Sequence, residues 1–212
     1  MILWRNFATM ADGCAAVAAL TVELLADAVI RRGRAHLILS GGRTPTGYLP
    51  LLAEAALPWK QIALSLSDER GVPLDHPDSN EAMVRRLLAD PTGAVVTGLL
   101  GAEENPASLR ALPWPADLSI LGVGPDGHVA SLFPGQSWGG DTDMVVPAHG
   151  PDGHRRLSLS AARLRQCRRH AMVATGAAKR EVLERAEAGD RRLPVSVVAA
   201  AETPLEVFWA PE

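Results

Sequence analysis

Short apolar segments alternate with amphipathic helical patterns along the chain of 212 residues. The apolar segments, typical of buried strands, are residues 35–40, 62–67, 94–99, 117–123, 170–175 and 205–210. The helical patterns between them are residues 45–56, 79–89, 104–111 and 177–187, preceded by a longer helix that Asp12 caps and Gly33 ends. Strands separated by helices favour a parallel sheet covered on both faces. The sequence therefore predicts an α/β fold, and its length favours one domain spanning residues 1–212.

Two segments depart from this alternation. Residues 155–160 alternate apolar and polar side chains without a crossover helix before them, which predicts an antiparallel edge or accessory strand. Residues 134–153 are rich in glycine and proline, and the strand and helix pattern resumes after them. We expect a mobile surface loop there rather than a linker between domains.

Charge and cysteine content limit the function classes. The formal net charge is −3, which offers no extended basic surface, so we expect neither nucleic acid nor an anionic membrane as the main partner. No uninterrupted apolar run approaches the roughly 18 residues of a membrane span. Cys14 and Cys167 lack metal-ligand spacing and are expected to be buried free thiols without a disulfide. A cytoplasmic enzyme or binding protein is the expected class.

The segment from Leu118 to Pro134 combines an apolar run, a glycine-rich turn, and then Asp126 and His128. A buried parallel strand would place this turn at the carboxyl edge of the sheet, where open α/β folds bind their ligands. His128 is therefore a candidate general base.

This region also fits parts of two other motifs. Gly122, Gly124 and Gly127 fit the dinucleotide fingerprint, but Pro125 stiffens the turn and the segment lies past the middle of the chain. Residues 135–139 fit the nucleophile elbow around Ser137, but that elbow needs a strand before it and a helix after it. We expect Ser137 to be a loop residue.

A second candidate site follows the strand at residues 35–40. Gly41 and Gly42 let the backbone approach a ligand, Thr44 is expected to cap the next helix, and Pro45 suits its first turn. The free N–H groups of such a helix start can bind an anion, although a plain turn explains the same residues. Pro50 falls inside this helix and should cost about 3 kcal/mol or kink it.

Charged residues follow two further strands. Asp68, Glu69 and Arg70 end the segment 62–67, where the carboxylates could hold the guanidinium in a cleft or form an ordinary solvated loop. Ser79 or Asn80 is expected to cap the helix after them. Lys179, one of only two lysines, lies in the first turn of a helix. A cation is disfavoured there unless an anion compensates it, so we interpret Lys179 as a phosphate ligand.

The remaining histidines carry weaker signals. His36 and His170 begin strands, and His76 lies in a loop between prolines. His149 and His154 bracket Asp152, but no apolar scaffold supports a metal site there. We expect no metal.

Four motifs together resemble the 6-phosphogluconolactonase family. They are SGGRTP at 40–45, SDER at 67–70 with Ser79 and Asn80 ten residues on, GVGPDGHVASLFP at 122–134, and GxxK at 176–179. The resemblance implies a three-layer α/β/α sandwich with a mainly parallel sheet, related to glucosamine-6-phosphate deaminases and ribose-5-phosphate isomerases. It implies hydrolysis of 6-phospho-D-glucono-1,5-lactone, the second step of the oxidative pentose phosphate pathway, without cofactor or metal. The expected partner is a phosphorylated sugar lactone, and the expected assembly is a monomer or weak homodimer.

The amino-sugar phosphate deaminases on the same fold are the competing interpretation. Deaminases similar to this chain carry a tyrosine where Arg70 stands, and a glutamate at the position of Phe133 that takes part in acid/base chemistry. An apolar ring cannot carry a proton, which favours the lactonase. A sugar-phosphate sensor without catalysis is a third possibility.

The residues suggest roles within this hypothesis. His128 would activate water, oriented by Asp126, and Arg70 would stabilise the oxyanion or bind ring hydroxyls. The remaining positions are expected to bind the phosphate or the sugar: Ser40, Gly41, Gly42, Arg43, Thr44, Asp68, Asn80, Gly124 and Lys179.

Overall fold

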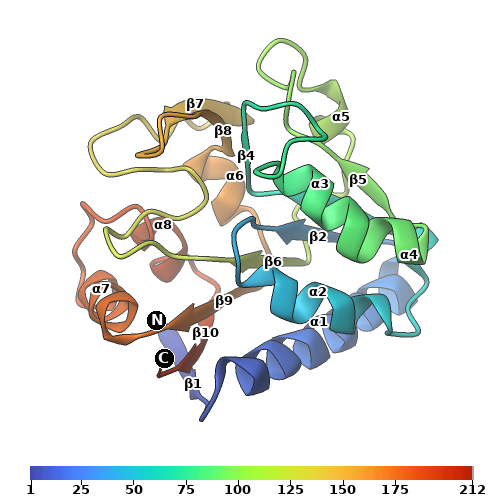
Figure 1. Cartoon of the computed structure of the whole chain (residues 1–212), viewed down its shortest axis with the longest axis horizontal. Helices are drawn as coiled ribbons and strands as arrows, with labels where there is room; N and C mark the ends of the chain where they lie inside the picture. Colours follow the sequence, from blue (N-terminus) through green and yellow to red (C-terminus); the bar gives the residue numbers. More distant parts are fainter. Residues whose placement is uncertain (212) are drawn as a thin grey trace.

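A seven-stranded parallel sheet forms the centre of the molecule in the computed structural model, which describes residues 1–211 (Figure 1). Its strand order is β1–β10–β9–β6–β2–β3–β5, and every neighbouring pair is parallel. The strands are β1 (Ile2–Asn6), β2 (Ala35–Leu39), β3 (Ile62–Leu66), β5 (Val95–Thr97), β6 (Leu118–Leu121), β9 (His170–Thr175) and β10 (Leu205–Ala210). All six predicted strands are present, and the expected α/β fold is confirmed.

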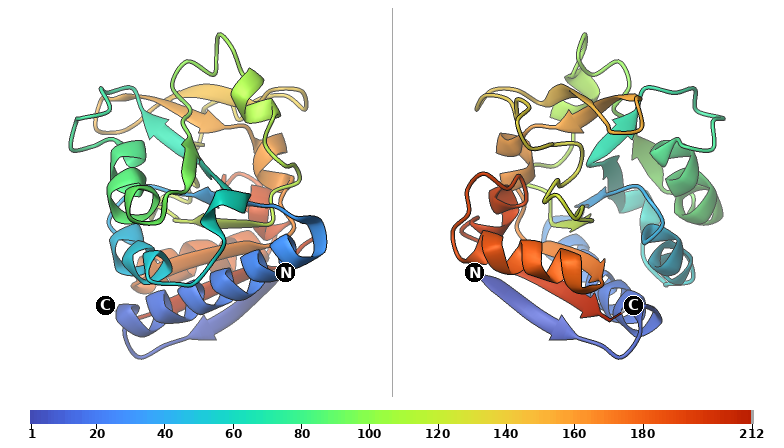
Figure 2. Two further views of the ribbon diagram at one scale, coloured as in Figure 1. Left: turned by 90° about the vertical axis from the view of Figure 1, so that its right-hand side faces the viewer. Right: turned by 60° about the vertical axis from the view of Figure 1, so that its left-hand side comes forward.

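Helices cover both faces of this sheet, as α1 and α7 on opposite sides in the two views of Figure 2 show. On one face α1 (Met10–Arg32) packs against β10, β2 and β9 and against α2 (Pro45–Ala53). On the other face α7 (Ala177–Glu187) contacts β9 and α8 (Ser196–Ala199), and α8 contacts α6 (Ala161–Arg165). Shorter helices complete the chain: η1 (Trp59–Gln61), α3 (Asn80–Val84), the π-helical turn η2 (Arg85–Ala89), α4 (Asp90–Thr92) and α5 (Ala107–Arg110).

A second, three-stranded antiparallel sheet lies above the carboxyl ends of the central strands (Figure 1). It contains β4 (Asp68–Arg70), β8 (Arg155–Leu159) and β7 (Val145–His149), in the order β4–β8–β7. The accessory strand predicted at 155–160 is therefore confirmed. The loop predicted over 134–153 is wrong for residues 145–149, which pair with β8. Pro147 is tolerated because β7 is an edge strand, where a missing N–H breaks no ladder on its outer side.

Ser67 joins the two sheets. It is the single residue between β3 and β4 and is fully buried. Its N–H donates to the carbonyl of Leu39 in the central sheet, N to O 2.7 Å, and its carbonyl accepts from the N–H of Leu159 in the small sheet at 2.8 Å. One residue is thus hydrogen-bonded to both sheets.

Helix α1 begins earlier than predicted. Thr9, not Asp12, is the capping residue: its hydroxyl accepts from the N–H of Asp12, which lies in the first turn. An acidic residue is favourable there because it faces the positive end of the helix dipole, so both positions carry capping signals. The predicted end is confirmed, because Gly33 adopts the left-handed conformation with φ 72°.

Helix α1 is also long and apolar enough, by length and composition alone, to cross a membrane. Core helices pass the same test. In this fold the buried residues of α1, among them Cys14, Val17 and Leu25, form the face that packs on the sheet. Cys14 and Cys167 are both buried free thiols, as predicted.

Candidate active site

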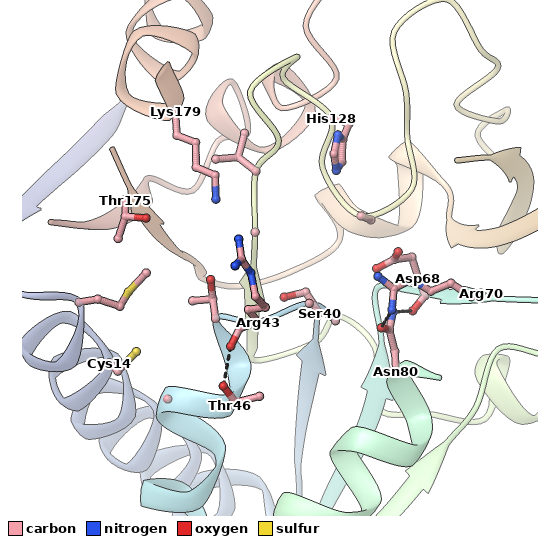
Figure 3. Close-up of a pocket in the computed structure, with 18 of the residues that line it drawn as sticks. Cys14, Ser40, Arg43, Thr46, Asp68, Arg70, Asn80, His128, Thr175 and Lys179 are labelled. Carbon is pink, nitrogen blue, oxygen red and sulfur yellow. Dashed lines mark hydrogen bonds between the residues drawn. The ribbon is translucent and has the colours of Figure 1, made fainter. Parts of the chain in front are cut away.

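A cavity of about 530 Å³ opens where β2, β3, β6 and β9 end, beneath the small sheet (Figure 3). Segments distant in the sequence supply its walls. The predicted site residues that line it are Ser40, Gly41, Gly42, Arg43, Thr44, Asp68, Arg70, Asn80, His128 and Lys179. The sequence reasoning missed Met10, Cys14, Thr46, Gly47, Gly122, Val123, Ala130, Arg156 and Thr175.

Two cations converge on one side of the cavity. Figure 3 shows the side chains of Arg43 and Lys179 extending toward each other from the loop after β2 and from the first turn of α7. Neither cation has a carboxylate oxygen within 4.0 Å among the described residues. Burial lowers the pKa of Lys179, and the nearby charge of Arg43 lowers it further. This part of the cavity is arranged for an anion.

The loop between β2 and α2 shapes the same side. Gly42 has φ 91°, a conformation that favours glycine. A Cβ at Gly41 would lie 1.8 Å from Oδ1 of Asn80, so only glycine lets this loop approach α3 so closely. The predicted cap at Thr44 is wrong. Thr44 already has helical dihedrals, φ −56° and ψ −42°, and its side chain makes no capping bond. The N–H groups of Thr46 and Gly47 donate instead to the carbonyls of Arg43 and Thr44.

Pro45 occupies the start of α2 as expected, and Pro50 lies inside this helix without ending it. The backbone N–H of Glu54 still donates to the carbonyl of Pro50 at 3.2 Å. Leu49 and Leu52 on either side of Pro50 are fully buried. Packing on the core therefore offsets the cost of the proline.

Arg70 and Asn80 lie together on the opposite side of the cavity (Figure 3). Nη1 of Arg70 donates to Oδ1 of Asn80 and to the carbonyl of Asp78, both at 2.7 Å. Nδ2 of Asn80 donates to the carbonyl of Asp68 at 2.8 Å. The expectation that neighbouring carboxylates hold the guanidinium is wrong, because amide and carbonyl oxygens hold it. No carboxylate oxygen lies within salt-bridge distance of Arg70 among residues 1–211.

Glu69 holds the backbone next to Arg70 and Asn80 in place through its carboxylate. It is fully buried, and its carboxylate accepts from the N–H groups of Arg70, Asn80 and Glu81 at 2.7 to 2.8 Å. Burial raises its pKa, while these hydrogen bonds oppose that rise. Ser79 caps α3 as predicted, its hydroxyl accepting from the N–H of Ala82. Glu69 is therefore a positioning residue for the start of α3 rather than part of the cavity wall.

His128 projects into the cavity from the glycine-rich turn after β6. Its Nδ1 lies 2.7 Å from Oδ1 of Asp126, which also accepts from the backbone N–H of His128 at 3.2 Å. The Phe133 ring lies against the imidazole, with ring centroids 4.8 Å apart. No helix follows this turn, so the dinucleotide fingerprint lacks the element that would bind a pyrophosphate.

Asp126 and Gly124 lie behind His128 and do not line the cavity. Ser137 lines a separate opening of about 640 Å³ between the loop before β7 and the segment around Glu103 and Arg110. It lies outside any strand or helix, as predicted. Among residues 1–211 no group of three or more His, Cys, Asp or Glu side chains is placed to hold a metal ion.

Comparison with known proteins places this architecture in a family. Residues 8–209 match the family model described as glucosamine-6-phosphate isomerases/6-phosphogluconolactonase. The chain belongs to this family. A 6-phosphogluconolactonase of Mesorhizobium japonicum is 35% identical over 98% of this chain and 95% of its own length. Its counterpart in Pseudomonas aeruginosa is 37% identical, covering 99% of this chain and 94% of that protein.

Solved structures of the family agree with the fold. The crystal structure of a 6-phosphogluconolactonase from Shewanella baltica matches with a TM-score of 0.91 and 30% identity, over 99% of this chain and 98% of that one. A monomeric glucosamine-6-phosphate deaminase matches with a TM-score of 0.80 at 19% identity, which shows the shared fold alone. The three-layer α/β/α expectation is confirmed.

Proposed function

We propose that this protein hydrolyses 6-phospho-D-glucono-1,5-lactone to 6-phosphogluconate, as in the second step of the oxidative pentose phosphate pathway. Relatives named 6-phosphogluconolactonase, 35% and 37% identical over nearly the whole chain, support this substrate. The observation that carries the proposal is that His128 lines the same cavity as the cation pair Arg43 and Lys179. A base and a phosphate anchor at one cavity are what a phosphorylated ester requires.

The phosphate is bound by Arg43 and Lys179 together with the loop of Ser40, Gly41, Gly42 and Thr44. Charge-assisted hydrogen bonds from two cations without carboxylate partners hold a dianion more tightly than neutral donors do. The amino end of α2 adds the positive end of the helix dipole. Anchoring at C6 places the ring of the sugar between these residues and His128, which lowers the entropic cost of the reaction.

Water is the nucleophile in this mechanism, without a covalent intermediate. Asp126 accepts a hydrogen bond from the protonated Nδ1 of His128, so the neutral ring presents the lone pair of Nε2 to the cavity. Nε2 takes a proton from a water molecule as the oxygen of that water attacks C1. The bond between C1 and the ring oxygen then breaks, and that oxygen takes up the proton, giving the open-chain acid. General base catalysis of this kind contributes about 10²- to 10⁴-fold.

Negative charge develops on the carbonyl oxygen of C1 during the attack. We propose that Arg70 stabilises this oxyanion. Its Nη1 is held by Asn80 and Asp78, and its charge has no carboxylate partner among the described residues. Asp68 and Asn80 complete the proposed sugar-binding residues. Gly124, expected from the sequence to bind the ligand, instead leaves room for the pair of His128 and Asp126. The proposed reaction uses no cofactor.

A deaminase reaction is the second candidate, favoured only by the family that the two enzymes share. Phe133 argues against it, since its ring occupies the side of His128 where a proton-carrying glutamate would be required. An apolar ring at this place cannot carry a proton to or from the substrate.

The test generates the phosphorylated lactone in situ from glucose 6-phosphate and follows acid release with and without the protein. We expect acceleration over spontaneous hydrolysis and its loss in His128→Ala, with the exposed His149→Ala as the matched control. Near-normal activity of His128→Ala would refute the assignment. Ammonia release from glucosamine 6-phosphate, measured in parallel, would support the deaminase instead.

A further inference from the structure

Arg156, which the sequence reasoning did not single out, faces Arg70 across the small sheet. The two residues are direct partners in the antiparallel register of β4 and β8, and both line the cavity. Like charges at opposed positions destabilise a sheet, and burying a cation adds a further cost. Arg156 is nevertheless only 9% exposed. This fold retains two opposed guanidinium groups at a single wall of the cavity.

Two contacts and the space at a glycine fix the guanidinium of Arg156. Nη2 donates to Oδ2 of Asp152, and the group lies over the Phe133 ring with its central carbon 5.7 Å from the ring centroid. Gly150 admits it, because a Cβ there would lie 2.3 Å from Nε. The group is therefore held in one orientation before any ligand binds.

Nη1 of Arg156 is left without an acceptor. Oδ2 of Asp68 lies 4.0 Å from it, which is beyond hydrogen-bond distance. Nε of Arg156 and Nε of Arg70 also lack partners although both atoms are buried. Two guanidinium groups with unused donors thus meet at the end of the cavity away from Arg43 and Lys179 (Figure 3 shows Arg70 there).

We propose that Arg156 and Arg70 form a second anion subsite, which binds the carboxylate at C1 of the sugar-acid product. During the reaction the same subsite binds the carbonyl oxygen at C1 as negative charge develops on it. This inference rests on the proposed function, and it makes Arg156 a specificity-determining residue. The cavity then carries cations at both ends and fits a ligand with an anion at each end. A phosphorylated alcohol of equal length leaves Arg70 without a carboxylate partner, and it leaves Asp152 as the hydrogen-bonded carboxylate of Arg156.

The experiment measures binding of 6-phosphogluconate and of glucitol 6-phosphate by titration calorimetry. The two ligands differ only in a carboxylate or a hydroxymethyl group at C1. We expect the wild-type protein to favour 6-phosphogluconate by about tenfold or more, as a charge-assisted hydrogen bond provides. Arg156→Met should lose most of this preference while keeping its affinity for glucitol 6-phosphate. Arg155→Met is the matched control, since Arg155 is the exposed neighbour paired with Glu103 outside the cavity.

A second variant decides the matter should Arg156→Met not fold. Gly150→Ala keeps every charge and requires no left-handed backbone, but its Cβ would displace the guanidinium. We expect it too to reduce the preference for the carboxylate, and Arg156→Lys to restore part of it. Equal weakening of both ligands, an unchanged preference in Gly150→Ala, or a wild-type protein that binds the two equally or binds neither would overturn the subsite.

The hydrolysis assay tests the proposed function independently of the binding preference. A protein that favours the carboxylate ligand but does not accelerate lactone hydrolysis retains the subsite and refutes the hydrolase. A protein that hydrolyses the lactone without this preference retains the activity and refutes the subsite.

Discussion

The carboxylate of Asp126 holds His128 at one ring nitrogen, with Oδ1 2.7 Å from Nδ1. Gly124 makes this pair possible. A Cβ at position 124 would lie 2.2 Å from Nδ1 of His128 and 2.5 Å from Oδ1 of Asp126. The absent side chain at Gly124 is thus part of what orients the proposed base.

Gly124→Ala should therefore impair turnover without impairing binding. Its methyl group forces the imidazole and the carboxylate apart, and a displacement of about 1 Å costs about 10²-fold in rate. Affinity for 6-phosphogluconate should change little, because the phosphate anchor is distant. Steady-state kinetics and calorimetry check this, with Gly140→Ala as the control, whose Cβ meets only Asp143 at 3.6 Å. A lost affinity with normal kcat would contradict the assigned role.

Lys179 should bind the phosphorylated ligand in a pH-dependent way. Its pKa is lowered by burial and then by Arg43, so it loses its proton at lower pH than a lysine in a model peptide. Affinity for 6-phosphogluconate should fall as the pH rises through that lowered value. Lys179→Ala should weaken binding by about tenfold or more and remove this pH dependence. The exposed Lys60→Ala is the control, and an unchanged alkaline profile in Lys179→Ala would exclude the role.

Two buried histidines should make the fold sensitive to mild acid. His36 in β2 and His170 in β9 each lie 2.8 Å from a serine hydroxyl on the adjacent strand, Ser65 and Ser119, and burial lowers the pKa of both to about 4. Their stabilisation is complete above the ordinary histidine pKa of about 6.5. As the pH falls toward 4 the unfolded chain takes up protons that the native state does not, so the free energy of unfolding decreases.

Urea unfolding at pH 7.5 and pH 5 measures this effect. The decrease should reach about 1.4 kcal/mol per pH unit for each histidine in this window. His36→Gln and His170→Gln should each reduce that slope, whereas the exposed His149→Gln should not. A slope unchanged in both buried variants would show that other groups dominate.

Arg180 should stabilise the helix that carries Lys179. Its guanidinium lies over two indole rings, with its central carbon 4.7 Å from the centroid of Trp4 and 4.8 Å from that of Trp209. Arg180→Ala should lower the free energy of unfolding by about 1 to 2 kcal/mol, because it removes two cation–π contacts that tie α7 to β1 and β10. Glu184→Ala breaks only the surface ion pair with Arg180 and should cost less than about 0.5 kcal/mol. Equal losses in thermal unfolding would assign the effect to the ion pair.

The central sheet could be predicted from the sequence because its strands are buried on both faces. β9 and β10 are mostly apolar, and their bounds match the predicted segments at 170–175 and 205–210. β1 was missed for the opposite reason. It is an edge strand whose residues Leu3, Arg5 and Asn6 are exposed, so its sequence lacks the apolar run of a central strand.

The site could be predicted only where local chemistry is unusual. The glycines around Ser40 and His128 and the isolated Lys179 differ visibly from their surroundings in the sequence. Arg156 does not, because it is one arginine among nineteen and its meaning comes from pairing with Arg70, 86 residues away. No local pattern carries such a long-range register.

The bridge at Ser67 has a consequence for which sugar acids the protein can accept. The proposed anion anchors Arg43 and Lys179 lie in the loop after β2 and in the first turn of α7, next to the central sheet, and Arg70 and Arg156 lie in the small sheet. The two backbone hydrogen bonds of one buried serine contribute to the span between them. Under the proposed function, selectivity between a six-carbon ligand and a shorter or longer homologue then depends partly on a residue outside the cavity wall.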